Sequence, residues 1–164
     1  RNDHDSVGAV VLSVVKNAPA GLGEPLYDKL DSALAAALMG INGVKAVEIG
    51  AGVKASETFG SVNNDEMDEL GFLSNNAGGI LGGISSGEDI VLKSHFKPTP
   101  SIFKEQKTLN LQGEVVDFEL RGRHDPCIGI RGSVVATAMI RLVIADMLLL
   151  NATIKLDNLK KIYG

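Results

Sequence analysis

The feature that most constrains the fold is a long apolar stretch near the end of the chain, residues 133–150. It carries two charged side chains, Arg141 and Asp146, and its apolar residues would lie on every side of a helix. Such a helix is buried inside a protein or spans a membrane. A charge at the centre of a span costs about 2.5–3.5 kcal/mol, and no other segment suggests a membrane. We therefore expect a helix capped by Ser133, ending near Leu150 and packed between two layers, most simply two sheets.

Several other segments have the pattern of β-strands. Residues 7–15 are rich in valine and almost entirely apolar, which is typical of a strand buried on both faces. Residues 44–49 and 90–96 are further strand candidates. Polar and apolar residues alternate in 115–120, and a turn precedes them at Gln112-Gly113, which predicts a hairpin.

One helix is expected between the first two strands. From Leu26 to Ile41 the apolar residues recur at helical spacing, and Pro25 stands where a helix favours its first residue. Gly40 and the Asn42-Gly43 pair would end this helix.

The order of these elements indicates the fold class. Residues 50–71 are polar and irregular and are interpreted as a solvated loop, and residues 74–87 form a glycine-rich loop. Strand, helix, strand, strand, hairpin and helix do not alternate regularly, so we predict an α+β fold. The 164 residues are enough for one domain, spanning 1–164.

Charge and cysteine content exclude several classes of function. The net charge of −4 predicts no general attraction to nucleic acid or to an anionic membrane, so an anionic ligand would need local positive charge. Cys127 is the only cysteine, which excludes an internal disulfide and fits a reducing, cytoplasmic compartment. The histidines and this cysteine lack metal-binding spacing, so no metal is expected. Residues 1–5 are polar and lack a starting methionine, which predicts no signal peptide and a piece of a longer chain.

Two segments could bind a ligand through their backbone. Residues 75–87 contain paired glycines, whose amides can approach a flat or anionic group, although spacing alone favours a tight turn. Residues 97–101, Lys-Pro-Thr-Pro-Ser, combine a cation, two hydroxyl groups and two prolines that stiffen the backbone. They fit a phosphate site and an ordinary strand exit equally well.

A third segment concentrates charge. Arg121, Arg123 and Arg131 lie close to His124 and Asp125. Arginine suits phosphate and carboxylate groups, and an aspartate beside such charge stays ionised and can act as a base. A surface ion-pair network is the commoner fate of such clusters. The apolar helix that follows places this cluster at the edge of a core, which favours a cleft.

Taken together and in order, these segments resemble the chorismate synthase family. Residues 75–87 resemble its NHAGGILGGISSG loop, residues 96–102 its KPT-S-I segment and residues 122–131 its GRHDPCVGIR segment. Residues 5–8 resemble GDS-GG, and residues 41–50 resemble INAVKGVEIG, so the match covers nearly the whole chain. The resemblance identifies the chain as the C-terminal half of such an enzyme.

The resemblance implies a lyase that requires reduced FMN. The family eliminates phosphate from 5-enolpyruvylshikimate-3-phosphate to give chorismate, the last common step of the shikimate pathway to aromatic amino acids. It implies Asp125 as the catalytic base and Arg123 as a contact to the anionic substrate. It also implies a β-α-β sandwich, with antiparallel sheets enclosing buried helices, and a homotetramer. The flavin site implied by the resemblance comprises Asn42, Gly43, Gly82, Lys97, Pro98, Thr99, Pro100, Ser101 and Arg123.

The family's other half is expected to be missing here. That half carries two catalytic histidines and several arginines, and none of the histidines in this sequence matches them. We therefore expect this piece alone to be inactive. The alternatives are a truncated module that keeps only fold, assembly or weak flavin binding, and an unrelated phosphate-binding domain. Whether the enzyme reduces its own flavin, in a reaction linked to NADP, or relies on an external reductant stays open.

Overall fold

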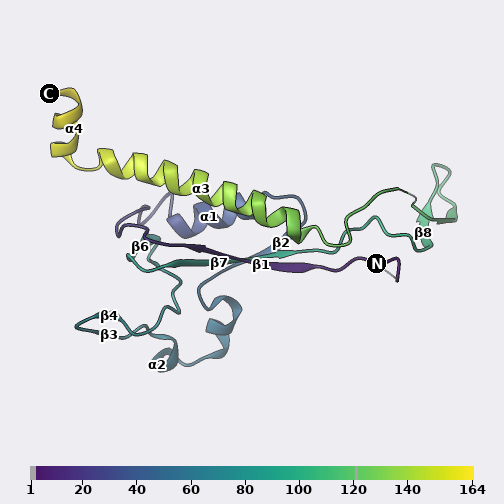
Figure 1. Ribbon diagram of the computed structural model, residues 1–164, viewed down its shortest axis with the longest axis horizontal. Coiled ribbons are helices and arrows are strands. Elements are labelled where there is room, and N and C mark those ends of the chain that lie inside the picture. The colour runs from purple at the N-terminus through teal and green to yellow at the C-terminus, as the bar shows by residue number, and fades with distance from the viewer. Residues whose placement is uncertain (1–2, 121) are drawn as a thin grey trace.

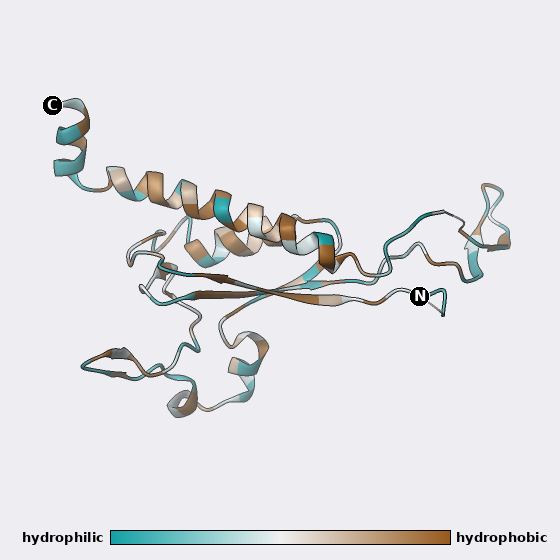
Figure 2. Ribbon diagram, in the orientation of Figure 1, coloured by the Kyte–Doolittle hydropathy of each residue, from teal (hydrophilic) through white to brown (hydrophobic). Residues whose placement is uncertain are grey.

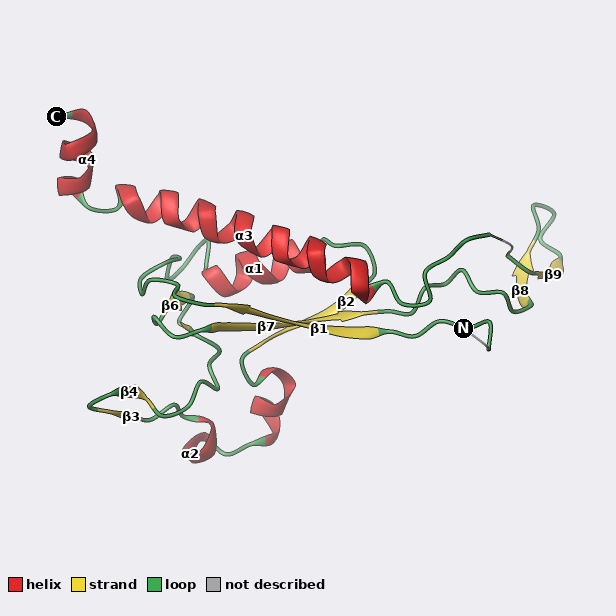
Figure 3. Ribbon diagram, viewed as in Figure 1, coloured by secondary structure: helices red, strands yellow, loops and turns green. Residues whose placement is uncertain are grey.

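The computed structural model describes residues 3–120 and 122–164. One antiparallel three-stranded sheet forms its centre, in the order β1, β7, β2 (Figures 1 and 3). Two helices, α1 and α3, lie over one face of this sheet, and an irregular arm that contains β3 and β4 hangs from the other side. The main elements are β1 (Ala9–Val15), α1 (Leu30–Met39), β2 (Val44–Ile49), β7 (Ile90–Phe96) and α3 (Gly129–Thr153). The combination of helices with an antiparallel sheet confirms the predicted α+β class.

The central strand β7 separates an apolar face from a charged one. Its residues are alternately buried and half-buried, beginning with a buried Ile90. On the half-buried side, Lys93 Nζ lies 3.2 Å from Glu48 Oε2 of β2, and His95 Nε2 lies 3.0 Å from Glu48 Oε1. The helices therefore pack on the apolar side, while an ion-pair cluster occupies the other.

Strand β1 is not buried on both faces, as its apolar sequence predicted. Val10, Leu12 and Val14 are 57%, 62% and 43% exposed, whereas Val11 and Val15 pack against the core. Among the described residues, β1 pairs only with β7, so it is an edge strand. The prediction fails because the described chain provides no layer on its outer face.

Helix α1 begins later than predicted, at Leu30 rather than near Leu26. Asp28 adopts a left-handed backbone with φ +52°, which interrupts any helix started at Pro25. The amide of Leu30 donates a 2.8 Å hydrogen bond to the carbonyl of Gly83, which fixes the helix start against the glycine-rich loop. Fully buried leucines, one per turn, form its inner face: Leu30, Leu34 and Leu38.

Helix α3 begins at Gly129, so Ser133 lies within the helix instead of capping it. The Ser133 hydroxyl donates to the carbonyl of Ile130 at 2.8 Å. The inner face of α3 carries the buried Ala136 and Ile140. The outer face is open, and its most exposed apolar residues are Ile130, Val134, Leu142 and Leu149 at 65–74%.

The expected burial of α3 on every side is therefore not observed. Figure 2 shows hydrophobic residues along the whole helix, broken by a hydrophilic stretch near its middle. By length and composition α3 could cross a membrane, as some core helices of soluble proteins also could. It packs against α1 and β1 on one side, and no second sheet of the described residues covers the other.

The remaining elements are short. The predicted hairpin is confirmed as β8 with β9, and it extends to the opposite end of the molecule from the β5–β6 hairpin (Figure 1). The segment 50–71, interpreted as a solvated loop, contains brief helical turns and part of a small hairpin. The short elements are η1 (Gly52–Glu57), α2 (Gly60–Asn63), β3 (Met67–Asp68), β4 (Gly71–Phe72), β5 (Ile80–Leu81), β6 (Ile84–Ser85), β8 (Gln106–Leu109), β9 (Val115–Phe118) and α4 (Leu156–Tyr163).

Candidate functional site

A cavity of about 760 Å³ opens where the end of α1 meets the end of β7. Asn42, Gly43 and Lys97 line it, as the resemblance implied for the flavin site. The amide of Lys97 donates a 2.8 Å hydrogen bond to the carbonyl of Gly43, which holds the two predicted segments side by side. Helix α3 adds Arg131 and the preceding loop adds Ile128, so the cavity has an apolar wall and two cations.

Gly43 is required by this close approach. Its φ is +93°, a conformation that side chains disfavour. A Cβ atom there would lie 2.7 Å from Cδ1 of Ile128, which is closer than van der Waals contact allows. The glycine therefore lets the turn after α1 reach the segment that leads into α3.

Three distant segments meet beside this cavity. The hydroxyl of Thr99 donates to the carbonyl of Asp125 at 2.8 Å, and the hydroxyl of Ser6 donates to the carbonyl of Thr99 at 2.6 Å. The amide of Val7 donates to the carbonyl of Pro126 at 2.9 Å. These bonds join the segment before β1, the segment after β7 and the loop before α3.

The Asp125 carboxylate lies at this junction and is half exposed. Its Oδ2 atom is 3.2 Å from Nη1 of Arg131, which is largely exposed. Asp125 also lines a smaller cavity of about 100 Å³ together with Ser101, His124 and His4. The ion pair with Arg131 orients the Asp125 carboxylate beside the larger cavity, which Arg131 also lines.

A second ion pair fastens the same junction. Lys104 Nζ lies 2.7 Å from Asp5 Oδ2. The hydrogen bond from Lys104 is the main cause that lowers the pKa of Asp5 below its usual range. Both side chains are about half exposed, so water and salt screen the attraction between them.

The other predicted residues of this region lie at its rim. Pro98, Pro100 and Arg123 are exposed and are not among the described residues that line the two cavities. Arg123 lies in the loop between β9 and α3, two residues before Asp125. The predicted contact between Arg123 and a substrate remains a prediction.

Gly82 lies far from the other predicted residues. It sits in the turn between β5 and β6, next to Gly83, whose carbonyl receives the first amide of α1. Lys97 instead contacts Gly43, just beyond the other end of α1. A helix of 10 residues is about 15 Å long, so one chain does not bring Gly82 into the cavity.

Sequence reasoning did not assign Arg131 to the flavin site, although it noted the residue within the arginine cluster. It lies in the first turn of α3 and faces both the cavity and Asp125. A helix register counted from Gly129 could have found it. Cys127 is half-buried and lines neither cavity, and among the described residues no group of three or more His, Cys, Asp or Glu is placed to hold a metal.

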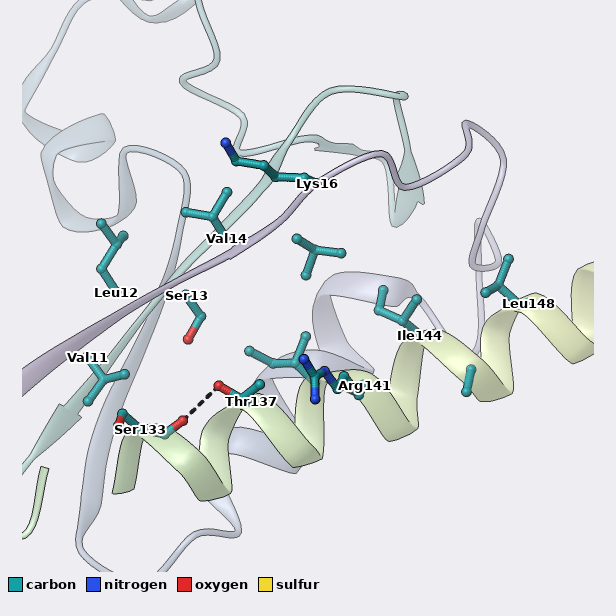
Figure 4. Close-up of a pocket in the computed structure, with 13 residues that line it drawn as sticks. Val11, Leu12, Ser13, Val14, Lys16, Ser133, Thr137, Arg141, Ile144 and Leu148 are labelled. Carbon is teal, nitrogen blue, oxygen red and sulfur yellow. Dashed lines mark hydrogen bonds between the residues drawn. The ribbon is translucent and has the colours of Figure 1, made fainter. Parts of the chain in front are cut away.

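Another hollow, of about 570 Å³, separates the free edge of β1 from α3. Figure 4 shows Val11 and Ser13 turned toward the helix, where Ser133, Thr137 and Arg141 face them. Apolar side chains dominate its lining, and its polar groups do not converge as those near Asp125 do. It is a gap in the packing at an open sheet edge.

The comparisons with known proteins all point to the same family. The family model described as chorismate synthase matches residues 1–149. The chain is 87% identical to the chorismate synthase of Campylobacter concisus over 100% of its length, and 79% identical to that of Campylobacter curvus over 99%. It covers 46% of each, so it spans about half the length of these curated relatives.

A solved structure entitled "Crystal Structure of Chorismate Synthase" has the same fold. It superposes with a TM-score of 0.74 at 31% identity, over 93% of this chain and 40% of that one. The matched family model and the near-complete coverage by close relatives agree with the motifs around the cavity. The chain therefore belongs to the chorismate synthase family.

Proposed function

We propose that this chain forms one half of a phosphate lyase that converts 5-enolpyruvylshikimate-3-phosphate to chorismate with the help of reduced FMN. The observation that carries the proposal is the junction of residues 6, 99 and 125, which sets the Asp125 carboxylate beside a large cavity lined by Lys97 and Arg131. Relatives with 71–87% identity bear the name of this enzyme.

The residues of the larger cavity fit FMN. Its volume of about 760 Å³ lies within the range of about 300–1,000 Å³ that small-molecule sites occupy. Ile41, Phe96 and Ile128 offer apolar surface to a flat ring, and Lys97 and Arg131 offer charge to a phosphate. When bound, reduced FMN would lend an electron transiently, without net redox change.

Asp125 would supply the base. Its carboxylate would take part in removing the hydrogen from C6 of the substrate, and the ion pair with Arg131 orients it for this role. The Thr99 hydroxyl holds the backbone of Asp125 in place. Arg123, two residues away, would contact the anionic substrate.

The position of Gly82 supports an assembly of several copies. Because one chain separates Gly82 from Lys97 by about the length of α1, Gly82 would join the flavin site only across a subunit contact. A contact between copies fits the homotetramer that the family resemblance implies, and we propose that assembly for the complete protein. The net charge of −4 and the single cysteine support a protein that works in the cytoplasm, with neither nucleic acid nor membrane as a partner.

The remaining half of the family length would complete the fold. The exposed face of α3 is an apolar surface that a second sheet would cover. In that arrangement the helices would lie between two sheets, as the resemblance implies.

An anaerobic assay with reduced FMN and substrate tests the proposal. We expect chorismate from a full-length polypeptide, defined as this chain joined to the remaining half of the family length, and none from this chain alone. Full-length protein that releases no chorismate would contradict the lyase function. Turnover by this chain alone would contradict the need for the other half.

Asp125→Asn in the full-length polypeptide tests the base. We expect at least a hundredfold loss of turnover, within the range of general-base catalysis, with flavin affinity largely retained. Asp117→Asn, on an exposed strand of the β8–β9 hairpin, is the matched control and should leave turnover unchanged. Near-normal activity of Asp125→Asn would remove its assigned role.

A binding or assembly module is the second candidate for this chain alone, favoured by its coverage of 46% of the relatives. Titration with FMN separates the two forms of this alternative. A change in the flavin spectrum indicates that the half-site binds, and an unchanged spectrum indicates that it serves assembly only.

A further inference from the structure

The acidic run 65–69, interpreted from the sequence as part of a solvated loop, contains one residue with a different role. Asp65 Oδ1 accepts hydrogen bonds from the Ser74 hydroxyl and the Asn76 amide, both at 2.6 Å. Asp65 Oδ2 accepts one from the Ala77 amide at 2.8 Å. Two successive backbone amides thus cradle its carboxylate, an arrangement that binds anions in many proteins.

The carboxylate is held in its charged form. Its partial burial would raise the pKa of Asp65, but the hydrogen bonds from Ser74, Ala77 and Asn76 outweigh this effect and lower it. Asp68 is the other residue of the run whose carboxylate has a described hydrogen bond, and it accepts from the amide of Leu70 within its own hairpin. Asp65 is therefore the residue of the run that reaches out of the arm.

The segment that Asp65 holds leads directly into the β5–β6 hairpin. Asn75 continues the anchoring, because its Oδ1 accepts from the Gly79 amide at 2.7 Å and its Nδ2 donates to the Asp89 carbonyl at 2.8 Å. The amide of Ser86 then donates to the carbonyl of Gly79 at 2.9 Å and closes the base of the hairpin.

Gly82 and Gly83 form the tip of this hairpin. Both have positive φ, +60° and +89°, as a two-residue hairpin turn requires. A Cβ atom on Gly82 would meet nothing within 4 Å, so this part of the backbone is free to approach a ligand. Asp65 and Leu81, the neighbour of Gly82, line one small cavity, which brings the anchor close to the tip.

We propose that Asp65 is a positioning residue for the flavin site: its carboxylate fixes the base of the β5–β6 hairpin and thereby the backbone of Gly82. This inference rests on the proposed function for the ligand that Gly82 meets. The anchoring itself depends only on the bonds to residues 74, 76 and 77.

Asp65→Asn in the full-length polypeptide is the test. An asparagine keeps the shape but has one carbonyl oxygen, so its NH₂ group must face one of the two backbone amides, donor against donor. We expect amide hydrogen exchange at Asn76, Ala77 and Ser86 to quicken about tenfold or more, because the Ser86 amide donates to the Gly79 carbonyl at the base of the hairpin. We expect FMN to bind about tenfold more weakly, which corresponds to about 1.4 kcal/mol, with kcat at saturating FMN within about twofold of the parent.

Two further variants make the result specific. Asp68→Asn removes a carboxylate from the same arm and should change neither exchange at Ser86 nor FMN affinity. Ser74→Ala removes one of the three hydrogen-bond donors to Asp65, at an exposed position. It should weaken FMN binding as well, but less than Asp65→Asn does. It replaces Asp65→Asn as the decisive variant if that protein does not fold.

The outcomes separate this inference from the proposed function. Unchanged exchange at Ser86 overturns the positioning role, and so does unchanged FMN affinity in a variant whose exchange quickens. An equal loss of kcat and FMN affinity also overturns it, since a positioning role predicts a loss of binding alone. If the parent itself does not bind FMN, the proposed function fails, and exchange at Ser86 alone decides whether Asp65 positions this hairpin.

Discussion

The hydroxyl of Thr99 donates a 2.8 Å hydrogen bond to the backbone carbonyl of Asp125, 26 residues further along the chain. The carbonyl of Thr99 in turn receives the hydroxyl of Ser6 at 2.6 Å. Both bonds are partly buried, so water does not replace them freely. The backbone around Asp125 is thus set by side chains from segments that are remote in sequence.

Thr99→Val removes this hydroxyl while keeping the branched shape of the side chain. We expect a loss of about 1 kcal/mol in the free energy of unfolding, since a partly buried carbonyl loses its donor. Thr137→Val is the control, because its hydroxyl bonds only to the Ser133 carbonyl in its own helix. Urea unfolding of both variants measures the difference. Equal unfolding free energies of the two variants would mean that the bond from Thr99 to Asp125 adds nothing to stability.

Gly43→Ala places a methyl group against Ile128 on a backbone with φ +93°. We expect a cost of at least about 1–3 kcal/mol from backbone strain alone. Gly60→Ala is the matched control, since its Cβ would meet nothing within 4 Å and its φ is not positive. Thermal unfolding should show a lower Tm for the first variant and little change for the second. An unchanged Tm of Gly43→Ala would contradict the close approach of this turn to Ile128.

Ser85→Ala disturbs a buried bridge between β6 and the loop that precedes α1. The Ser85 hydroxyl donates to the Pro19 carbonyl at 2.7 Å and accepts from the Leu22 amide at 2.9 Å. Its removal leaves a buried amide without its acceptor, which costs about 1–3 kcal/mol. Denaturant unfolding checks the value, with Ser86→Ala as the control, because that hydroxyl makes only a 3.4 Å contact to the Glu88 amide. Equal stability of both variants would exclude the bridge as a significant contribution.

Acid should weaken the anchoring by Asp65. The pKa of Asp65 is lowered in the folded protein, so its contribution to stability is complete above the ordinary value of 3.8 and is lost as pH falls through the lower folded value. The difference in unfolding free energy between the parent and Asp65→Asn should therefore be largest near neutral pH and shrink below 3.8. Urea titrations at several pH values measure it. A difference that stays constant into acid would show that the charge of Asp65 is not the source of the anchoring.

Much of the fold could be predicted from local patterns. The alternation in β7 and the hairpin of β8 and β9 follow from side-chain periodicity, which reflects the pleat itself. The start of α1 could not be predicted in this way, because Leu30 is fixed by a hydrogen bond to Gly83, which is distant in sequence. The apolar run of β1 predicted burial on both faces, which is wrong for the described residues, because such a run does not show which part of a protein would supply the cover.

The candidate site was predictable only segment by segment. The motifs that contain Asn42, Lys97 and Asp125 do meet, since one hydrogen bond joins Gly43 to Lys97 and another joins Thr99 to Asp125. Gly82 belongs to an equally specific motif but lies at the other end of α1. A one-dimensional pattern carries no information about which end of a helix its loop will reach.

The separation of Gly82 from Lys97 has a consequence for genetics. If each catalytic centre combines Gly82 of one copy with Lys97 of another, then two inactive alleles, one altered at each residue, would complement each other when expressed in the same cell. A mixed oligomer would contain centres that draw both intact residues from different chains. Restored growth on medium without aromatic amino acids would thus reveal a shared centre without any purified protein.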